Sequence, residues 1–188
     1  MATDTSSDSD LIARTLSGDS AAFETLVRRH YRTAYAVALA HSANRAEAED
    51  VCHDSFVRVA ERLADCRNPD RFVHWLCSVV RNHARNVVAR ENVRRALELT
   101  PESAASGHDL ERELELRELG SRLESALANL SPVQREVVLL HDLDGWTHED
   151  IARLIGSSAG MSRQHLFHAR RLLRTVLGQN TSEEYLND

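Results

Sequence analysis

The stretch from Ile151 to Leu177 combines a helical pattern with positive charge that no acidic residue of the stretch opposes. It stands in a chain whose formal net charge is -6. Its basic residues are Arg153, Arg163, Arg170, Arg171 and Arg174. Three of them, Arg163, Arg170 and Arg174, are seven and four residues apart, so on a helix they would fall within about 40° of one another. An exposed row of planar guanidinium groups suits phosphates and base edges, although arginine is also common on solvated helices.

A second basic stretch covers residues 81–95, with five arginines and one acid. Within it, Asn82 and Asn86 are one helical turn apart, beside Arg81 and Arg85. Amides are poor choices for a helix interior unless they have a task, and one such task is hydrogen bonding to a base edge. Trp75 precedes the stretch and could stack on a base, but its place on an apolar stripe favours packing in the core.

Ten histidines and three cysteines leave a metal-dependent enzyme or sensor as a different interpretation. Cys52-His53, Cys66 and Cys77 have spacings that fit no standard zinc pattern. Cys77 stands among apolar neighbours, as a core cysteine does. We find no pairing of nucleophile and base and no phosphate-binding loop motif, so we expect no enzymatic activity, no metal and no cofactor.

The composition predicts an all-helical protein in a reducing compartment. A chain of 188 residues with 42% apolar content can form one domain or two small ones, and 7 glycines with 3 prolines favour helices. No apolar run approaches the ~20 residues that a membrane span requires, and the acidic start "MATDTSSDSD" is unlike a signal peptide. An odd number of cysteines does not suggest a disulfide framework. We therefore expect a cytoplasmic protein.

The apolar spacing predicts a four-helix unit over residues 10–96, after a tail over residues 1–9. A short helix ends at Gly18, and Asp19 caps the next one. A third helix covers about 45–63, "DCRNPD" at 65–70 forms a turn, and a long helix covers about 70–96.

A small, polar segment at 97–109 is the predicted flexible linker to a smaller helical unit at 110–177, with a short tail at 178–188. Ser131 and Gln134 predict a capping box around Pro132, and Thr147 predicts the start of a helix that ends at Gly156. A last helix from about 161 to 177 completes a helix-turn-helix pattern.

Together these segments resemble a bacterial RNA polymerase sigma factor of the extracytoplasmic-function (ECF) group. "AFETLVRRHY" at 22–31, "AEDVCHDSFVRVAERL" at 48–63 and "RFVHWLCSVVRNHARN" at 71–86 are similar to region 2 of that group. "LSPVQREVVLLHDLDGWTHEDIARLIG" at 130–156, followed by "HARRLLR" at 168–174, is similar to region 4. The resemblance implies a transcription initiation factor whose region 2 opens the −10 promoter element and whose region 4 reads the −35 element.

The resemblance also implies roles for individual residues. The −10 element would meet Arg67, Asn68, Trp75, Arg81, Asn82, Arg85 and Asn86. The −35 element would meet Arg163, Gln164, His165, His168, Arg170, Arg171 and Arg174. The β′ coiled coil of the polymerase core would meet Glu49, Asp50, Asp54 and Arg58, and region 4 would meet the β flap. Most relatives are held inactive by an anti-sigma protein, so such a partner is also implied.

Three residues depart from the family pattern around the recognition helix. Ser157 and Ser162 stand where relatives have apolar residues, and Met161 replaces a small hydroxyl residue. We expect weaker packing there, with Ser158 or Ser162 as the helix cap. The alternative function is a helix-turn-helix regulator that binds duplex DNA without polymerase, and the match at 48–86 argues against it.

Overall fold

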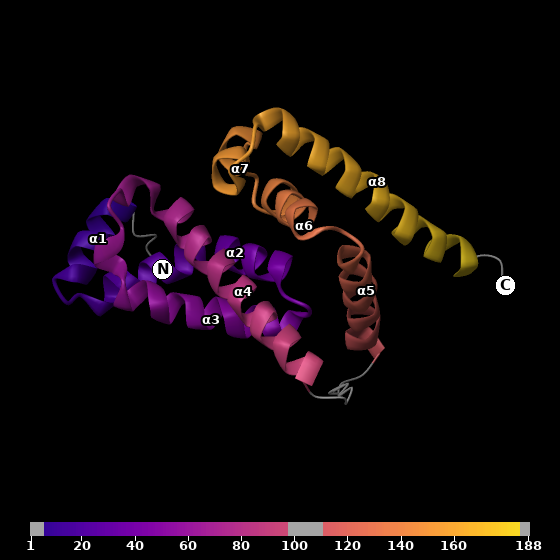
Figure 1. Ribbon diagram of the computed structural model, residues 1–188, viewed down its shortest axis with the longest axis horizontal. Helices are drawn as coiled ribbons and strands as arrows, with labels where there is room; N and C mark the ends of the chain where they lie inside the picture. The colour runs from indigo at the N-terminus through magenta and orange to yellow at the C-terminus, as the bar shows by residue number, and fades with distance from the viewer. Residues whose placement is uncertain (1–5, 98–110, 185–188) are drawn as a thin grey trace.

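The computed structural model describes residues 6–97 and 111–184, and every regular element in these ranges is a helix. The N-terminal unit contains α1 (Asp8–Leu16), α2 (Ser20–His41), α3 (Arg45–Glu61) and α4 (Phe72–Leu97), with short 3-10 turns at Leu63–Asp65 and Pro69–Arg71. The C-terminal unit contains α5 (Glu111–Ala128), α6 (Pro132–Val138), η3 (Leu139–Leu143), α7 (His148–Ile155) and α8 (Ala159–Glu184). Figure 1 shows both units, which confirm the all-helical prediction within these ranges.

Local side-chain caps set most helix starts, as the sequence predicted. Asp19 accepts hydrogen bonds from the Ala21 and Ala22 amides at 3.0 and 3.2 Å. Ser131 and Gln134 form the predicted capping box at α6. The helix α1 begins earlier than expected, because Ser7 and Asp10 form a further capping box. Residues 7–9 are therefore not part of a tail.

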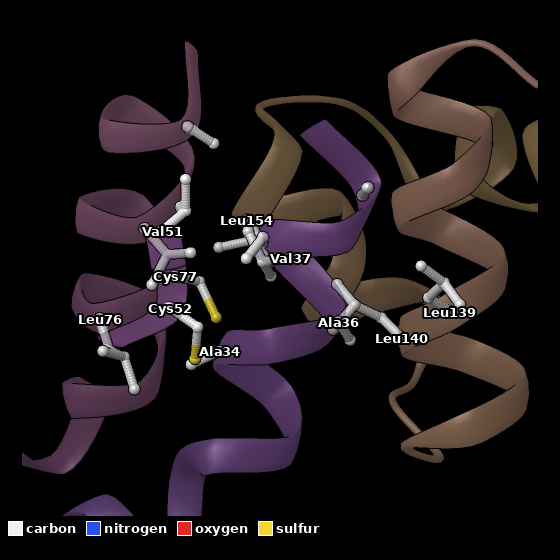
Figure 2. Packing of buried hydrophobic residues seen from close by; sticks show 14 of the residues in the cluster. Ala34, Ala36, Val37, Val51, Cys52, Leu76, Cys77, Leu139, Leu140 and Leu154 are labelled. Carbon is white, nitrogen blue, oxygen red and sulfur yellow. The ribbon is translucent and has the colours of Figure 1, made fainter. Parts of the chain in front are cut away.

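The N-terminal unit is built around α2, which packs against α1, α3 and α4. The core of this unit is mostly aliphatic, with Leu26, Val37, Val59, Leu76 and Val80 fully buried and the ring of Phe72 among them. Cys52 and Cys77 lie in the same core, where Figure 2 shows them near Ala34. Burial raises the pKa of the Cys52 thiol to about 12 and also raises that of Cys77, so both are neutral packing residues.

The C-terminal unit differs from the prediction at both ends of its last helix. Ser158 caps α8 by accepting from the Met161 amide at 3.2 Å, so the helix begins at Ala159 rather than Met161. It also continues to Glu184, beyond the predicted end at Leu177, because Gly178 does not break the helix. Gly156 ends α7 with φ of 69°, as expected of a left-handed cap.

The two units are in contact, which the sequence did not predict. Packing joins α2 to α6 and η3, and joins α4 to α7. Buried residues of both units form one cluster, in which Leu140 lies beside Ala36 and Leu154 lies near Val37 (Figure 2). In Figure 1, α6 and α7 lie between the N-terminal helices and α8. Of the predicted linker, Leu97 ends α4 and residues 98–109 lie outside the described ranges.

Candidate nucleic-acid interface

The first candidate surface is one face of α4. Asn82, Arg85 and Asn86 are exposed, and their spacing of three and four residues places them on the same side of the helix. This face is fixed because the opposite side of α4 buries Leu76, Val80 and Ala84 in the core. Rigid positioning of amide and guanidinium donors is what hydrogen bonding to bases and phosphates requires.

The segment before α4 adds two more of the predicted residues. Arg67 and Asn68 are exposed in the turn that precedes Pro69–Arg71. The Cys66 thiol donates to the Asn68 carbonyl oxygen at 3.6 Å, which holds the turn close to the core. Trp75 is half-buried, with its ring centroid 6.1 Å from that of Phe72, so the structure agrees with packing as its first role.

Arg81 is not part of the exposed face. Its Nε donates to Glu136 Oε2 at 3.2 Å, and its Nη2 donates to Glu136 Oε1. Its Nη1 donates to the Leu154 carbonyl oxygen at 3.0 Å. Arg81, which was predicted to contact the −10 element, is therefore hydrogen-bonded to α6 and α7. Asn82, Arg85 and Asn86 remain exposed to solvent.

Glu136 is a buried carboxylate, with 1% of the residue exposed. Burial alone would raise its pKa, but hydrogen bonds from His41 and Arg81, and their charge, lower it overall. His41 Nε2 lies 2.8 Å from Glu136 Oε2. Glu136 thus remains ionised, and its charge is stabilised by side chains of the other unit.

The second candidate surface is α8, whose arginines lie off the packing stripe that Leu166 and Ala169 form. Leu166 and Ala169 are buried in this stripe. Of the seven predicted −35 contact residues, six are exposed: Arg163, Gln164, His168, Arg170, Arg171 and Arg174. His165 is half-buried. The row of arginines predicted from spacing therefore faces outward.

Acidic residues from neighbouring elements lie beside two of these arginines. Arg163 forms an ion pair with Glu149 of α7 at 3.1 Å. Arg170 forms a two-pronged pair with Asp142 of η3, with Nε at 3.0 Å from Oδ2. The absence of acids within 151–177 thus did not make the charge unopposed in space. These pairs are exposed, so they contribute little to stability and can yield to a phosphate.

A polar chain anchors the first turn of α8. Ser162 is fully buried, and its Oγ lies 3.0 Å from His148 Nδ1. The His148 ring stacks on His141 with centroids 4.6 Å apart. The serine that departs from the family pattern is therefore satisfied by a hydrogen bond, which offsets the loss of packing expected at that position. Ser157 and Met161 are both exposed.

The sequence interpretation missed Phe167 on this helix. Phe167 is 64% exposed and lies between Arg163 and Arg170 on the outward side of α8. Its position four residues after Arg163 and off the packing stripe was the signal that could have identified it. An exposed aromatic ring there can contact apolar groups of a bound ligand, including a thymine methyl group.

The third candidate surface is on α3. Glu49, Asp50, Asp54 and Arg58 are all exposed, and the last three recur every four residues on one face. Val57 and Tyr31, at 48% and 46% exposure, add apolar area nearby. Tyr31 stacks on Phe56 with centroids 6.3 Å apart, so a mixed acidic and apolar surface is available for a protein partner.

Metal sites and membrane-spanning helices are two further features that the sequence left to be tested. In residues 6–97 and 111–184, no group of three or more His, Cys, Asp or Glu side chains is placed to hold a metal ion. Within those same ranges, no helix has the length and apolar character to cross a membrane. All three cysteines are free.

Comparisons with known proteins agree with this arrangement. Residues 26–94 match the family "Sigma-70 region 2", and residues 121–173 match "Sigma-70, region 4". The ECF RNA polymerase sigma factor SigE of Mycolicibacterium smegmatis is 31% identical over 173 residues, which cover 88% of this chain and 66% of that protein. The RNA polymerase sigma factor CarQ of Myxococcus xanthus is 31% identical over 163 residues, which cover 84% of this chain and 90% of CarQ.

A solved structure extends the likeness to three dimensions. CnrH, determined in complex with the cytosolic domain of CnrY, superposes with a TM-score of 0.66 at 28% identity, covering 93% of this chain and 99% of CnrH. Sequence, family matches and architecture thus agree, and the chain belongs to the sigma-70 family of RNA polymerase sigma factors, in its ECF group.

Proposed function

We propose that this chain binds RNA polymerase core and directs transcription initiation at specific promoters. The observation that carries the proposal is the presence, in one sigma-family chain, of two outward-facing helical surfaces, on α4 and on α8, in the order of regions 2 and 4. We assign residues 10–96 to core binding and the −10 element, residues 110–177 to the −35 element, and residues 97–109 to the tether.

The α4 surface would capture unstacked bases of the −10 element. Flipping a base costs a few kcal/mol, and stacking averages about 1.4 kcal/mol per step, so the bases must be held in place by compensating contacts. Asn82 and Asn86 can bond to base edges, while Arg85 and Arg67 neutralise the backbone. Asn68 would line the same pocket. Binding alone would supply the energy of melting.

The α8 surface would enter the major groove of the −35 element. Arg163 and Gln164 lie near the helix start, where recognition helices meet base edges. His165 and His168 follow them, and Arg170, Arg171 and Arg174 would contact phosphates along the groove. On binding, the ion pairs of Arg163 with Glu149 and of Arg170 with Asp142 would be replaced by contacts of these arginines with DNA.

The α3 surface would dock on the β′ coiled coil through Glu49, Asp50, Asp54 and Arg58, and the C-terminal unit would meet the β flap. Because the polymerase carries out the chemistry, the chain itself would not be an enzyme, and its place of action is the cytoplasm. CnrH was solved with a cytosolic domain of another protein, which supports a protein inhibitor of the anti-sigma type as a further partner here.

In vitro transcription on a genomic library with purified core polymerase tests the proposal directly. We expect discrete start sites that depend on the chain, and co-elution of the chain with core. The matched comparison is a variant with Asp50→Arg and Asp54→Arg on α3, which should lose co-elution and transcripts together. A wild-type chain that binds DNA but neither joins core nor directs a start would instead identify a helix-turn-helix regulator.

A further inference from the structure

The contact between the two units contains a buried charge beside its apolar residues. Glu136 of α6 is 1% exposed, and its described hydrogen bonds come from His41 of α2 and Arg81 of α4. Both partners belong to the N-terminal unit. A buried carboxylate needs such partners because its transfer out of water is costly when it is unpaired. In the closed arrangement, therefore, Glu136 depends on the other unit for its stabilisation.

Other polar contacts cross the same boundary. The Arg135 Nη1 group donates to the Ser42 carbonyl oxygen at 3.2 Å. Thr33 Oγ1 donates to Asp144, and the Arg32 guanidinium donates to the Leu143 carbonyl oxygen. These contacts place α6 and η3 firmly on α2 (Figure 1). The boundary is thus a specific interface with matched donors and acceptors.

This closed arrangement conflicts with reading two promoter elements at once. Elements named −35 and −10 are about 25 base pairs apart, which is about 85 Å along the duplex axis. Units that touch at Arg81 and Glu136 cannot contact both elements at that separation. The 13 residues from 98 to 110 can extend to at most about 45 Å, which allows the units to move apart.

The carboxylate of Glu136 also occupies the donors that Arg81 would offer to DNA. It accepts from Nε and Nη2 together, and this is the fork that binds a phosphate or a guanine edge in two-pronged fashion. Glu136 thus takes the place of a DNA acceptor on Arg81. For this reason the closed contact competes with the promoter at the atomic level, in addition to keeping the two units together.

We propose that Glu136, Arg81 and His41 form an autoinhibitory clasp that keeps the free chain closed and Arg81 occupied until polymerase core draws the two units apart. The proposal rests on the proposed function, with Arg81 joining the −10 surface once it is released, as the family resemblance implies. The ion pair can open reversibly, because both charges regain water when the units separate. The effector that opens the clasp is a large surface that binds the two units at separate places.

The test uses the full chain with Glu136→Gln, which keeps the shape of the side chain and removes its charge. Small-angle X-ray scattering of the free protein should show a larger radius of gyration and a longer maximum dimension than in wild type. Fluorescence anisotropy with a short single-stranded DNA of mixed sequence, without polymerase, should show affinity raised by about fivefold or more, the range of a typical coupling between two states.

A second variant and a control separate opening from misfolding. Asp144→Asn weakens the Thr33 contact at the same interface without touching Arg81, and it should open the chain in the same direction. Glu24→Gln breaks an exposed pair with Arg28 inside α2 and should change neither quantity. Circular dichroism should show equal helix content in all four proteins.

The outcomes decide the proposal. Opening together with tighter DNA binding in Glu136→Gln supports the clasp, and adding Arg81→Gln should abolish the gain in affinity. Unchanged dimensions in both interface variants, or opening with unchanged affinity, overturns it. If the proposed function itself is wrong, the result differs: neither wild type nor Glu136→Gln would then co-elute with polymerase core.

Discussion

The helices α4 and α8 are each 26 residues long and rich in arginine, yet the fold uses their charge differently. Arg81 of α4 has a side chain only 11% exposed and pairs with a carboxylate that is 1% exposed. Arg163 of α8 has a side chain 60% exposed, as does its partner Glu149. Because water screens the second pair much more than the first, the charge of Arg81 is committed to the contact between the units, whereas the charge of Arg163 lies on the surface.

The comparison teaches that spacing on a helix identifies which residues share a face but not what covers that face. The arginines of α8 stay outward because α6 and α7 pack against its apolar stripe. The face of α4 is divided, since Asn82 and Arg85 are open while Arg81 is covered by α6 and α7. Substitutions on the two helices should therefore differ in size and in the property they change.

The largest effect is expected from Glu136→Ala. The change leaves the Arg81 guanidinium buried without a counter-charge, a loss of about 3–5 kcal/mol if the units stay closed. Because separation lets Arg81 regain water, the measured loss cannot exceed the free energy that holds the units together. Urea unfolding followed by tryptophan fluorescence should show a lower midpoint and a broader transition, as Trp75 and Trp146 report on different units.

The double variant Glu136→Ala with Arg81→Met isolates the cause. Removing the unpaired guanidinium should recover part of the stability, because no buried charge then lacks a partner. If the double variant is as unstable as Glu136→Ala alone, the loss has a source other than the ion pair. A loss below about 1 kcal/mol in the single variant would place this contact in the range of surface pairs.

Asn82→Ala should impair promoter opening by about tenfold or more, because one well-placed hydrogen-bonding pair to a base contributes about 1–3 kcal/mol. Permanganate reactivity of thymines in the open complex measures the effect, and co-elution with core should be unchanged. Asn129→Ala is a suitable control, since Asn129 is exposed and its Nδ2 bonds to the Ser125 carbonyl oxygen, away from α4. Equal reactivity in wild type and Asn82→Ala would remove Asn82 from the proposed −10 site.

Arg163→Glu should lower affinity for the −35 duplex, most strongly at low salt. It replaces a cation with an anion next to Glu149, and a lost phosphate contact should reduce the slope of log affinity against log salt by about 0.9. Arg153→Glu on α7 is the matched control, because Arg153 is exposed and pairs with Asp150 outside α8. Parallel salt curves for wild type and Arg163→Glu would show that Arg163 makes no phosphate contact.

Features set by neighbouring residues were predictable from the sequence, and features set by distant ones were not. The caps at Asp19, Ser131 and Thr147 involve residues two or three positions away, so the pattern contains them. The outward row on α8 follows in the same way from helical spacing. The predicted end of the last helix near Leu177 was wrong, because the helix continues through Gly178, and a glycine ends a helix only where the chain turns left-handed.

The interface between the units had no local signal. Glu136 lies 95 residues from His41 and 55 residues from Arg81 along the chain. A lone glutamate within "VQREVVLL" has the appearance of a solvent-facing position, and only the packed structure shows that it is buried. The pairing of Arg170 with Asp142 could not be predicted for the same reason, because Asp142 lies 28 residues earlier in the chain.

The smallest effect concerns pH and the contact of His74 with α7. The His74 ring lies 5.4 Å from that of Trp146, and neither ring nitrogen has a hydrogen-bond partner. Burial lowers the pKa of His74, an effect that Asp150 opposes and that Arg153 and Arg71 reinforce. A His with a lowered pKa in the closed state stabilises that state above its ordinary value of 6.5, and the stabilisation is lost as pH falls below 6.5.

Acidification from pH 8 towards 5.5 should therefore loosen the contact between α4 and α7, with an increase in radius of gyration smaller than that of Glu136→Gln. Glu136 has a lowered pKa and Asp150 does too, so both stay ionised across this range and His74 is the titrating group on the α4 side of this contact. Burial and the nearby His141 also lower the pKa of His148 on α7, but His148 bonds to Ser162 inside the C-terminal unit. His83 also titrates with a lowered pKa, but it bonds to Ser55 inside the N-terminal unit. His74→Phe keeps a ring against Trp146 and should abolish the pH response, whereas an identical response in that variant would assign the effect to another histidine.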